Sequence, residues 1–488
     1  MKKNLLTVAL LALSLHSTAQ VMVHVDNSGV FYVGESALVY NGGGLQTKGN
    51  GILDVRGNVM IEGASTDVLK TLDNAGTGNK TDGGNIILRL NNPAGYAAST
   101  YGQLYINGIS QGNISAIVDK EYRAGKHGTY QQIALPFYNK AISTLSGTGI
   151  GTLGKTFSNV RYSKNEVLTW NNLTAVSDNL SVSSLTPKST TYYMLGSNGF
   201  DSANPPASMP ANAPAPAGSV YTLKGIPFTN GVTEKLINAA NGVNFGATGN
   251  ALNSYNERYN SYLQDDWDYP VAPANPWAVS TFGRNIYQFG NPYLTNLDLG
   301  FIGITESGAV TDNNAIPSVQ GIRYDPGTVV TLSSGTFSSG AKYINFTSGN
   351  PVPVGDVGLV IKPMQTFVVK LRNNDAESGT NKTLNFDNLR RFKSTPRVGG
   401  TPYSVNAGRG TDASGTVKQL GVIALDADGN ELARTYYAVY PSAVTGHTSY
   451  PTTQSILGGQ NIIGTFEEDA VNGGYDMNYV NAYWLYIN

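Results

Sequence analysis

Short runs of alternating apolar and polar residues, separated by glycine and asparagine, fill residues 20–125 of the chain. Runs such as VMVHV and NVMIE have the period of two that a half-buried β-strand requires. Gly29, Gly44 and Gly51 each precede an apolar residue, as at the tight corners of a β-solenoid with stacked coils. A small β-sandwich or meander would show the same alternation, so the pattern predicts either a solenoid-like or a sandwich region.

Longer apolar strands dominate residues 126–400, for example EVLTW, TTYYMLG and MQTFVVKL. Only GVTEKLINAANG, residues 231–242, has an early acidic residue, apolar spacing and a final glycine that indicate a helix. Repeated proline at residues 204–218 removes backbone donors and predicts an extended loop. We therefore expect a central β-rich module of β-sandwich-like sheets, with one helix at most.

A hairpin is the main feature expected in residues 401–488, which we predict to be a further β-sandwich-like region. Two apolar strands flank the sequence DADGNE, whose composition is typical of a tight turn. Asp426, Asp428 and Asn430 also resemble a calcium loop, but Gly429 comes too early for that pattern. Structural calcium elsewhere in the turns stays open and unassigned. The whole chain is thus expected to be mainly β and multidomain.

The N-terminus has the features of a signal peptide. Lys2 and Lys3 precede an apolar stretch at residues 5–15, and Ser17 and Ala19 form a small-x-small cleavage signal. Residues 1–19 are therefore expected to be removed, and no later segment is apolar and long enough to span a bilayer. The sequence contains no cysteine, which excludes disulfides and a lipoprotein anchor.

Charge and histidine content limit the function classes. Lysine and arginine number 32 against 33 aspartates and glutamates, without the basic stripe that nucleic-acid binding requires. After the leader only His24, His127 and His447 remain, far apart and without metal-ligand spacing. No nucleophile elbow and no phosphate-binding loop occurs. We predict no enzymatic activity and no cofactor, with a secreted hydrolase lacking a motif-level active site as a distant alternative.

One segment carries candidate binding chemistry. Aromatic faces stack on sugar C–H groups while carboxylates accept bonds from hydroxyls, so a mixed aromatic and acidic cluster indicates a glycan site. Aromatic residues near prolines in a long loop more often pack the loop against a sheet. The candidate glycan-binding residues are Asp265, Asp266, Trp267, Asp268, Tyr269 and Trp277.

The segment FGRNIYQFGNPYLTNLDL carries a family resemblance through Gly290, Asn291, Pro292, Tyr293 and Leu297-Asp298. Together with IALP before it and IKPMQTFVV after it, this GNPY motif resembles a module of Bacteroidota secreted proteins that usually carry a type IX secretion sorting domain. The resemblance covers roughly residues 130–397. We interpret the motif itself as architecture, with Gly290 supplying an unusual backbone angle and Tyr293 packing.

The resemblance implies an export route rather than a reaction. It leads us to expect a secreted or cell-surface protein outside the outer membrane, with the outer-membrane export machinery as a partner. Ser202 lies in Asp-Ser-Ala, which resembles the Bacteroidota O-glycosylation acceptor. No sorting domain is visible, and the aromatic end of the sequence favours a truncated chain over a different export signal.

These observations favour a non-catalytic, structural or adhesin-like surface protein. A glycan-binding surface module, using the cluster around Trp267, is the first alternative. Its partners would be surface glycans or other surface proteins.

Overall fold

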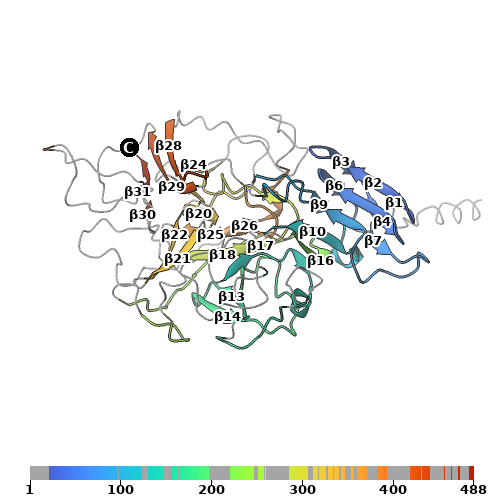
Figure 1. The fold of residues 1–488 in the computed structure, drawn as a ribbon, viewed down its shortest axis with the longest axis horizontal. Helices are drawn as coiled ribbons and strands as arrows, with labels where there is room; N and C mark the ends of the chain where they lie inside the picture. Colours follow the sequence, from blue (N-terminus) through green and yellow to red (C-terminus); the bar gives the residue numbers. More distant parts are fainter. Residues whose placement is uncertain are drawn as a thin grey trace, which may run out of the picture.

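The computed structural model is built from short β-strands arranged in several sheets (Figure 1). No helix of seven or more residues occurs in the part of the chain that it describes, so the predicted mainly β class is confirmed. The structure describes residues 21–96, 98–123, 130–147, 155–162, 165–196, 200, 220–246, 251–257, 259, 285–305, 312–316, 318–325, 328–332, 335–339, 342–346, 353–356, 360–371, 382–392, 418–429, 431–439, 455–456, 463, 471–472 and 483–487.

The N-terminal region is a β-solenoid. The chain visits three faces in turn, and each new strand pairs in parallel with the strand one coil earlier on the same face. A meander would pair neighbouring strands antiparallel, so the solenoid is the alternative that the structure supports. The first coil is β1 (Val21–Val25), β2 (Val30–Val33) and β3 (Leu38–Asn41). The following strands are β4 (Gly44–Lys48), β5 (Ile52–Val55), β6 (Asn58–Glu62), β7 (Leu69–Leu72), β8 (Ile86–Leu88), β9 (Gln103–Asn107) and β10 (Val118–Tyr122).

Glycine and asparagine allow the corners of successive coils to stack. A Cβ atom on Gly51 would lie 2.5 Å from the carbonyl oxygen of Val25 in the coil before it, closer than any real contact. Asn85 donates from its side-chain amide to the carbonyls of Gly49 and Gly51, at 2.9 and 2.6 Å. Side-chain amides thus satisfy corner carbonyls that lie outside the strand ladders.

The second face of the solenoid continues into the central region. β16 (Tyr221–Pro227) pairs antiparallel with β10, and β12 (Phe137–Tyr138) pairs antiparallel with β16, which gives a sheet of order β12-β16-β10-β8-β5-β2. The predicted boundary after residue 125 therefore falls within one continuous sheet. Members of the first hydrophobic core come from both sides of that boundary, among them Leu53, Ile86, Phe137, Tyr193 and Leu223.

Two antiparallel sheets make up most of the central module, and each is buried on both faces. On β13, Val167 belongs to the first core while Leu168 belongs to a third core, which also contains Ile286 and Val368 of the second sheet. Tyr287, next to Ile286, points into a second core on the far side. Burial of both faces explains the continuous apolar runs in the sequence. The first sheet is β11 (Gln131–Ile133), β15 (Tyr193–Leu195), β13 (Val167–Asn171) and β14 (Val176–Asn179). The second is β18 (Ile286–Gly290), β25 (Thr366–Leu371), β20 (Val319–Asp325), β23 (Lys342–Phe346) and β24 (Pro353–Gly355).

Three small two-stranded sheets complete the central module. They are β17 (Thr233–Lys235) with β26 (Thr383–Asn385), β19 (Asn296–Leu297) with β27 (Arg390–Arg391), and β21 (Thr328–Leu332) with β22 (Gly335–Ser339). β17 lies inside residues 231–242, so the helix predicted there is wrong. β17 pairs with β26, a segment about 150 residues later, and this tertiary contact overrides the local helix propensity.

The predicted hairpin near the C-terminus is confirmed. β28 (Lys418–Leu425) and β29 (Glu431–Val439) pair antiparallel, and β31 (Tyr483–Ile487) and β30 (Ser455–Ile456) extend their sheet. The Asp426 carboxylate accepts the N–H of Asp428 at 2.9 Å, and Gly429 has a φ of 81°. These residues thus form the tight turn between the two strands rather than an EF-hand-like loop.

One glutamine docks this hairpin on the central module. The Gln419 side chain accepts from the Gly355 N–H and donates to the Gly355 carbonyl, both at 2.8 Å, as a neighbouring strand would. Lys342 pairs with Glu431 at 2.9 Å in the same contact. The hairpin is therefore attached beside the edge strand β24.

The GNPY motif is a buried structural junction. Asn291 is fully buried, and its amide nitrogen donates to the carbonyls of Thr295 at 2.9 Å, Lys362 at 3.1 Å and Ile361 at 3.3 Å. Its oxygen accepts the N–H of Tyr293 at 2.9 Å. One side chain therefore replaces the strand pairing that this bend interrupts, which supports the architectural interpretation.

Gly290 serves close packing rather than an unusual backbone angle. Its φ lies outside the left-handed region, so that part of the expectation is wrong. A Cβ atom at this position would lie 2.6 Å from the Thr191 carbonyl oxygen and 2.8 Å from the Ala134 Cβ. The two central sheets can approach here because glycine has no side chain.

Arg390 joins the motif to the solenoid. Its guanidinium lies over the Tyr293 ring, 3.4 Å from the centroid, and over the Tyr105 ring at 4.8 Å. It donates to the Ile106 carbonyl at 2.6 Å and pairs with Asp387 at 3.5 Å. Because Arg390 is only 1% exposed, these partners must compensate a buried charge.

Candidate ligand-binding surface

The sequence-predicted glycan residues and the predicted glycosylation site cannot be compared with the fold. Ser202, Asp265, Asp266, Trp267, Asp268, Tyr269 and Trp277 all lie outside the described residues. The described residues on either side of residues 260–284 are well packed. Tyr259 contacts Phe245 with ring centroids 4.7 Å apart, and the Asn285 N–H donates to the Ala239 carbonyl at 3.0 Å.

A cluster of aromatic and charged side chains lies where the chain leads into that segment. We name it the Arg161 cluster; it comprises Arg161, Tyr162, Asp178, Tyr255 and Glu257. Arg161 donates to Glu257 at 2.6 Å, and its guanidinium lies over the Tyr255 ring, 4.1 Å from the centroid. It also lies 5.4 Å from the centroid of the Tyr162 ring. The arginine thus joins two tyrosine rings and a carboxylate in one surface.

Several hydrogen bonds hold the cluster against β14. Arg161 donates to the Ser177 carbonyl at 2.8 Å, and the Tyr255 hydroxyl donates to Asp178 at 3.0 Å. Partial burial, followed by the hydrogen bond to Asp178, raises the pKa of the Tyr255 hydroxyl. That hydroxyl therefore stays protonated, and remains a donor, at any physiological pH.

Glu166 is a buried carboxylate that holds the turn carrying Tyr162. This carboxylate is 1% exposed and accepts from the Tyr130 hydroxyl at 2.5 Å, the Tyr162 N–H at 3.0 Å and Asn179 at 3.1 Å. The turn that it holds gives Tyr162 a left-handed φ of 62°. Bulky residues seldom adopt this conformation, so the surrounding bonds must maintain it.

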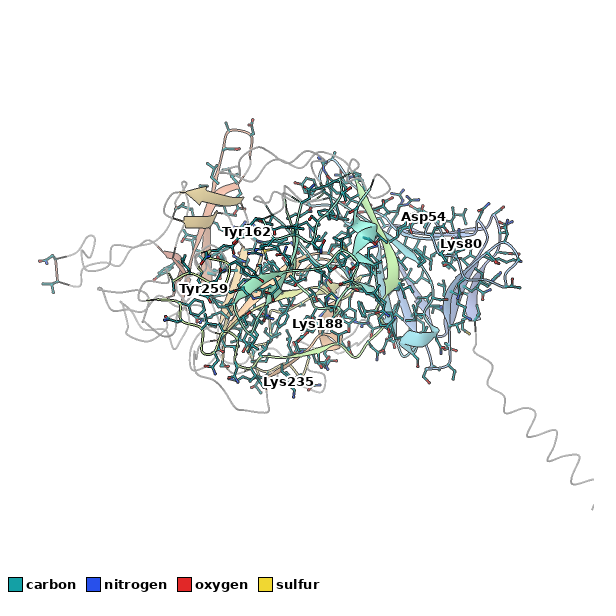
Figure 2. The ribbon with its side chains drawn as sticks, turned by 90° about the horizontal axis from the view of Figure 1, so that it is seen from below. Asp54, Lys80, Tyr162, Lys188, Lys235 and Tyr259 are labelled. Atoms are coloured by element: carbon teal, nitrogen blue, oxygen red, sulfur yellow. The ribbon has the colours of Figure 1, made fainter. Side chains whose placement is uncertain are left out.

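Tyr162 is the exposed member of the cluster. It is 64% exposed, while its hydroxyl donates to the Tyr255 carbonyl. Figure 2 shows Tyr162 and Tyr259 over the central module, away from Asp54 and Lys80 of the solenoid. An exposed aromatic ring beside an arginine and two carboxylates can stack on a sugar and hydrogen-bond its hydroxyls.

The sequence patterns did not predict this cluster. Arg161 and Tyr162 lie in a turn. The partners of Arg161 are 16 and 96 residues away along the chain, so no local pattern could have indicated them.

The described residues contain neither a metal-ligand cluster nor a membrane-spanning helix. Within them, no group of three or more histidine, aspartate or glutamate side chains is placed to hold a metal ion. None of their helices has the length and apolarity needed to cross a membrane. No protein-family model, no curated protein and no solved structure matches the chain.

Proposed function

We propose that this chain is an exported, non-catalytic cell-surface protein of structural or adhesin-like type. The observation that carries the proposal is the continuous sheet and shared core joining the solenoid to the central layers (Figure 1). A solenoid is quasi-one-dimensional, and rigid fusion to a layered module gives an elongated body suited to display at a distance. The predicted signal peptide and the resemblance to Bacteroidota surface proteins support the proposed location.

Ion pairs between successive coils support a structural role. Arg89 on the outer face of the solenoid pairs with Asp54 at 3.0 Å and with Glu121 at 2.8 Å, so one arginine bridges neighbours on both sides. The hydrogen bond to Asp54, then that to Glu121, raises the pKa of Arg89. Networks of this kind resist separation of the coils better than isolated surface pairs do.

Export through the outer-membrane machinery is the part of the proposal that can be tested first. The complete coding sequence would be expressed in a Bacteroidota host with an intact type IX route and in one lacking it. We expect the intact host to present the protein to external protease and to antibody on whole cells. Retention inside intact cells would contradict a surface function, and equal exposure in both hosts would point to another export route.

Glycan binding is the second candidate, and the Arg161 cluster is the observation that favours it. The cluster presents an exposed ring, an arginine and carboxylates beside the residues leading into the segment with Asp265 and Trp267. We expect wild type to bind a defined glycan class on an array, and Tyr162→Ala and Trp267→Ala each to weaken that binding about tenfold or more, equivalent to roughly 1.4 kcal/mol.

Leu173→Ala is the matched control for this array. Leu173 is 62% exposed at the turn between β13 and β14 but contributes no ring or polar group. Its loss should leave glycan binding unchanged. Wild type that binds no glycan would eliminate this candidate, and equal weakening by all three variants would indicate a general effect on folding.

A further inference from the structure

We propose that the solenoid end formed by β1, β2 and β3 is a self-association surface at which two copies of the chain meet end to end. Each of these strands is the last strand in its sheet. Their partners β4, β5 and β6 occupy one edge, and the part of the chain that the structure describes places no strand on the other. Three rows of backbone N–H and C=O groups are therefore available for pairing at this end. Figure 1 shows β1, β2 and β3 at the outer end of the solenoid, away from the central module.

The hydrophobic core is also incomplete at this end. In the second coil the inward residues Leu45, Leu53 and Val59 are at most 2% exposed. Their counterparts in the first coil, Val23, Phe31 and Val39, are only partly buried. Each layer of a solenoid core is normally covered by the next coil, and among the described residues no coil covers the first layer.

Most outward side chains of the first coil are apolar or aromatic as well. Met22, Val30, Tyr32 and Tyr40 are 57–66% exposed. Among the three strands VMVHV, VFYV and LVYN, only His24 carries an ionisable side chain other than tyrosine, and there is no proline or lysine. Natural edge strands that must remain unpaired usually carry such blocking residues. Their absence favours an edge that is paired in the working protein.

A second copy fits this surface because the opposite end of the solenoid is occupied. The Leu104 N–H on β9 donates to the Leu294 carbonyl at 3.1 Å, and Arg390 binds the Ile106 carbonyl. β10 is covered by β16. A head-to-tail array is therefore blocked. The same end of a second copy, by contrast, offers three strand edges in the same triangular arrangement.

Two such ends meet through a two-fold axis perpendicular to the solenoid. This operation reverses strand direction, so each strand of the first coil would pair antiparallel with a strand of its copy. The contact closes at a dimer and exposes no new edge. Val23, Phe31 and Val39 of each copy would then cover those of the other.

Measurement of the mass in solution tests the proposal. The chain beginning at Gln20, the form expected after leader removal, and the full chain would both be studied by sedimentation over a range of concentrations. We expect the processed chain to sediment with twice the mass of one chain. A full chain that remains monomeric would be consistent with the proposal, since its leader directly precedes β1. A processed chain that is monomeric at every concentration would overturn the proposal.

Tyr32→Lys identifies the surface, and Leu420→Lys is its matched control. Tyr32 is 58% exposed on β2, while Leu420 is 62% exposed on β28, another edge strand. A lysine on a pairing edge disfavours association, so Tyr32→Lys should give monomers, and Leu420→Lys should remain dimeric. The melting temperature of Tyr32→Lys should equal that of wild type diluted until it is monomeric. The reverse result would place the interface on the C-terminal hairpin and refute the proposal.

Hydrogen exchange gives an answer even if Tyr32→Lys fails to fold. In the wild-type processed chain, amides of β1, β2 and β3 should exchange more slowly at high concentration than after dilution. Amides of β28 should show no such change. Concentration-independent exchange in the first coil would contradict end-to-end pairing.

Discussion

At the scale of single residues, buried polar side chains hold together segments that are far apart in the sequence. Asn291 satisfies three carbonyls and one N–H, and Arg390 reaches from β27 to the solenoid. A buried polar group left without its partner destabilises a fold by about 1–3 kcal/mol, so both positions allow few substitutions. The sequence indicated an architectural role for Asn291, and the fold reveals its partners.

Lys120 is a buried cation inside the last solenoid strand. It is 2% exposed, its ammonium lies 4.4 Å from the centroid of the Tyr101 ring, and it donates to the Gly102 carbonyl at 3.4 Å. Burial lowers the pKa of Lys120 from 10.5 to about 7. Below pH 7 both the folded and the unfolded chain hold this proton, so the folded state carries the full desolvation penalty. Between pH 7 and 10.5 the unfolded chain binds more protons, so stability increases with pH.

Lys120→Met should therefore stabilise the protein most at pH 6 and progressively less toward pH 10. The difference in unfolding free energy between wild type and variant should shrink by up to about 1.4 kcal/mol per pH unit within this window. Urea unfolding at several pH values measures it. Lys188→Met, which removes a lysine whose side chain is 56% exposed, is the control for the loss of one positive charge. A constant difference between Lys120→Met and wild type would contradict the buried-charge explanation.

At the scale of elements, the solenoid depends on corners more than on strand length. Its strands contain three to five residues, too few for stable isolated pairing. Close stacking of the coils compensates, because it aligns the inward side chains in continuous layers. Gly51 lies at such a corner, where a side chain would collide with backbone from the coil before it.

Gly51→Ala should destabilise the protein by about 1–3 kcal/mol, the usual effect of forcing an extra carbon into a packed site. Thermal unfolding followed by circular dichroism measures the change. Gly112→Ala is the control, since a Cβ there meets no atom within 4 Å. Equal melting temperatures for the two variants would mean that the corner can relax.

The wrong helix prediction also belongs to this scale. Residues 231–242 have a helical composition, yet Glu234 on β17 pairs with Leu384 on β26. The Glu234 carboxylate also accepts a hydrogen bond from Lys188 at 2.6 Å. Short segments with weak local preference adopt the conformation that their tertiary neighbours require.

At the scale of the whole molecule, the solenoid and the central module share one core. The first core contains residues from β2 to β16 and also Leu294 and Met364. Cutting the chain after residue 125 would expose this core and leave the sheet edge at β10 without β16. The two regions should therefore fold as one cooperative unit.

A chain of residues 20–125 should consequently show no cooperative thermal transition, whereas residues 20–400, which retain these cores, should unfold sharply. Circular dichroism and calorimetry would make the comparison. A sharp transition in the shorter fragment would establish the solenoid as an independent domain.

The amino-acid sequence determined the local features of this protein: the two-residue alternation of the strands, the glycine corners and the hairpin turn at Asp426. Each depends on neighbouring residues alone, through backbone sterics and side-chain direction. The choice between solenoid and sandwich required the fold, because it depends on parallel pairing between residues 20 to 45 positions apart.

The Arg161 cluster likewise arises from tertiary structure, since Glu257 lies 96 residues from its arginine. Its charges and rings are ordinary surface residues in the sequence, and they form a surface only where β14 and residues 253–257 meet. The open solenoid end is similar. Its apolar alternation is visible in the sequence of the first coil. That no described strand pairs with the outer edges of β1, β2 and β3 is seen only in the fold, because pairing is a property of two segments and not of one.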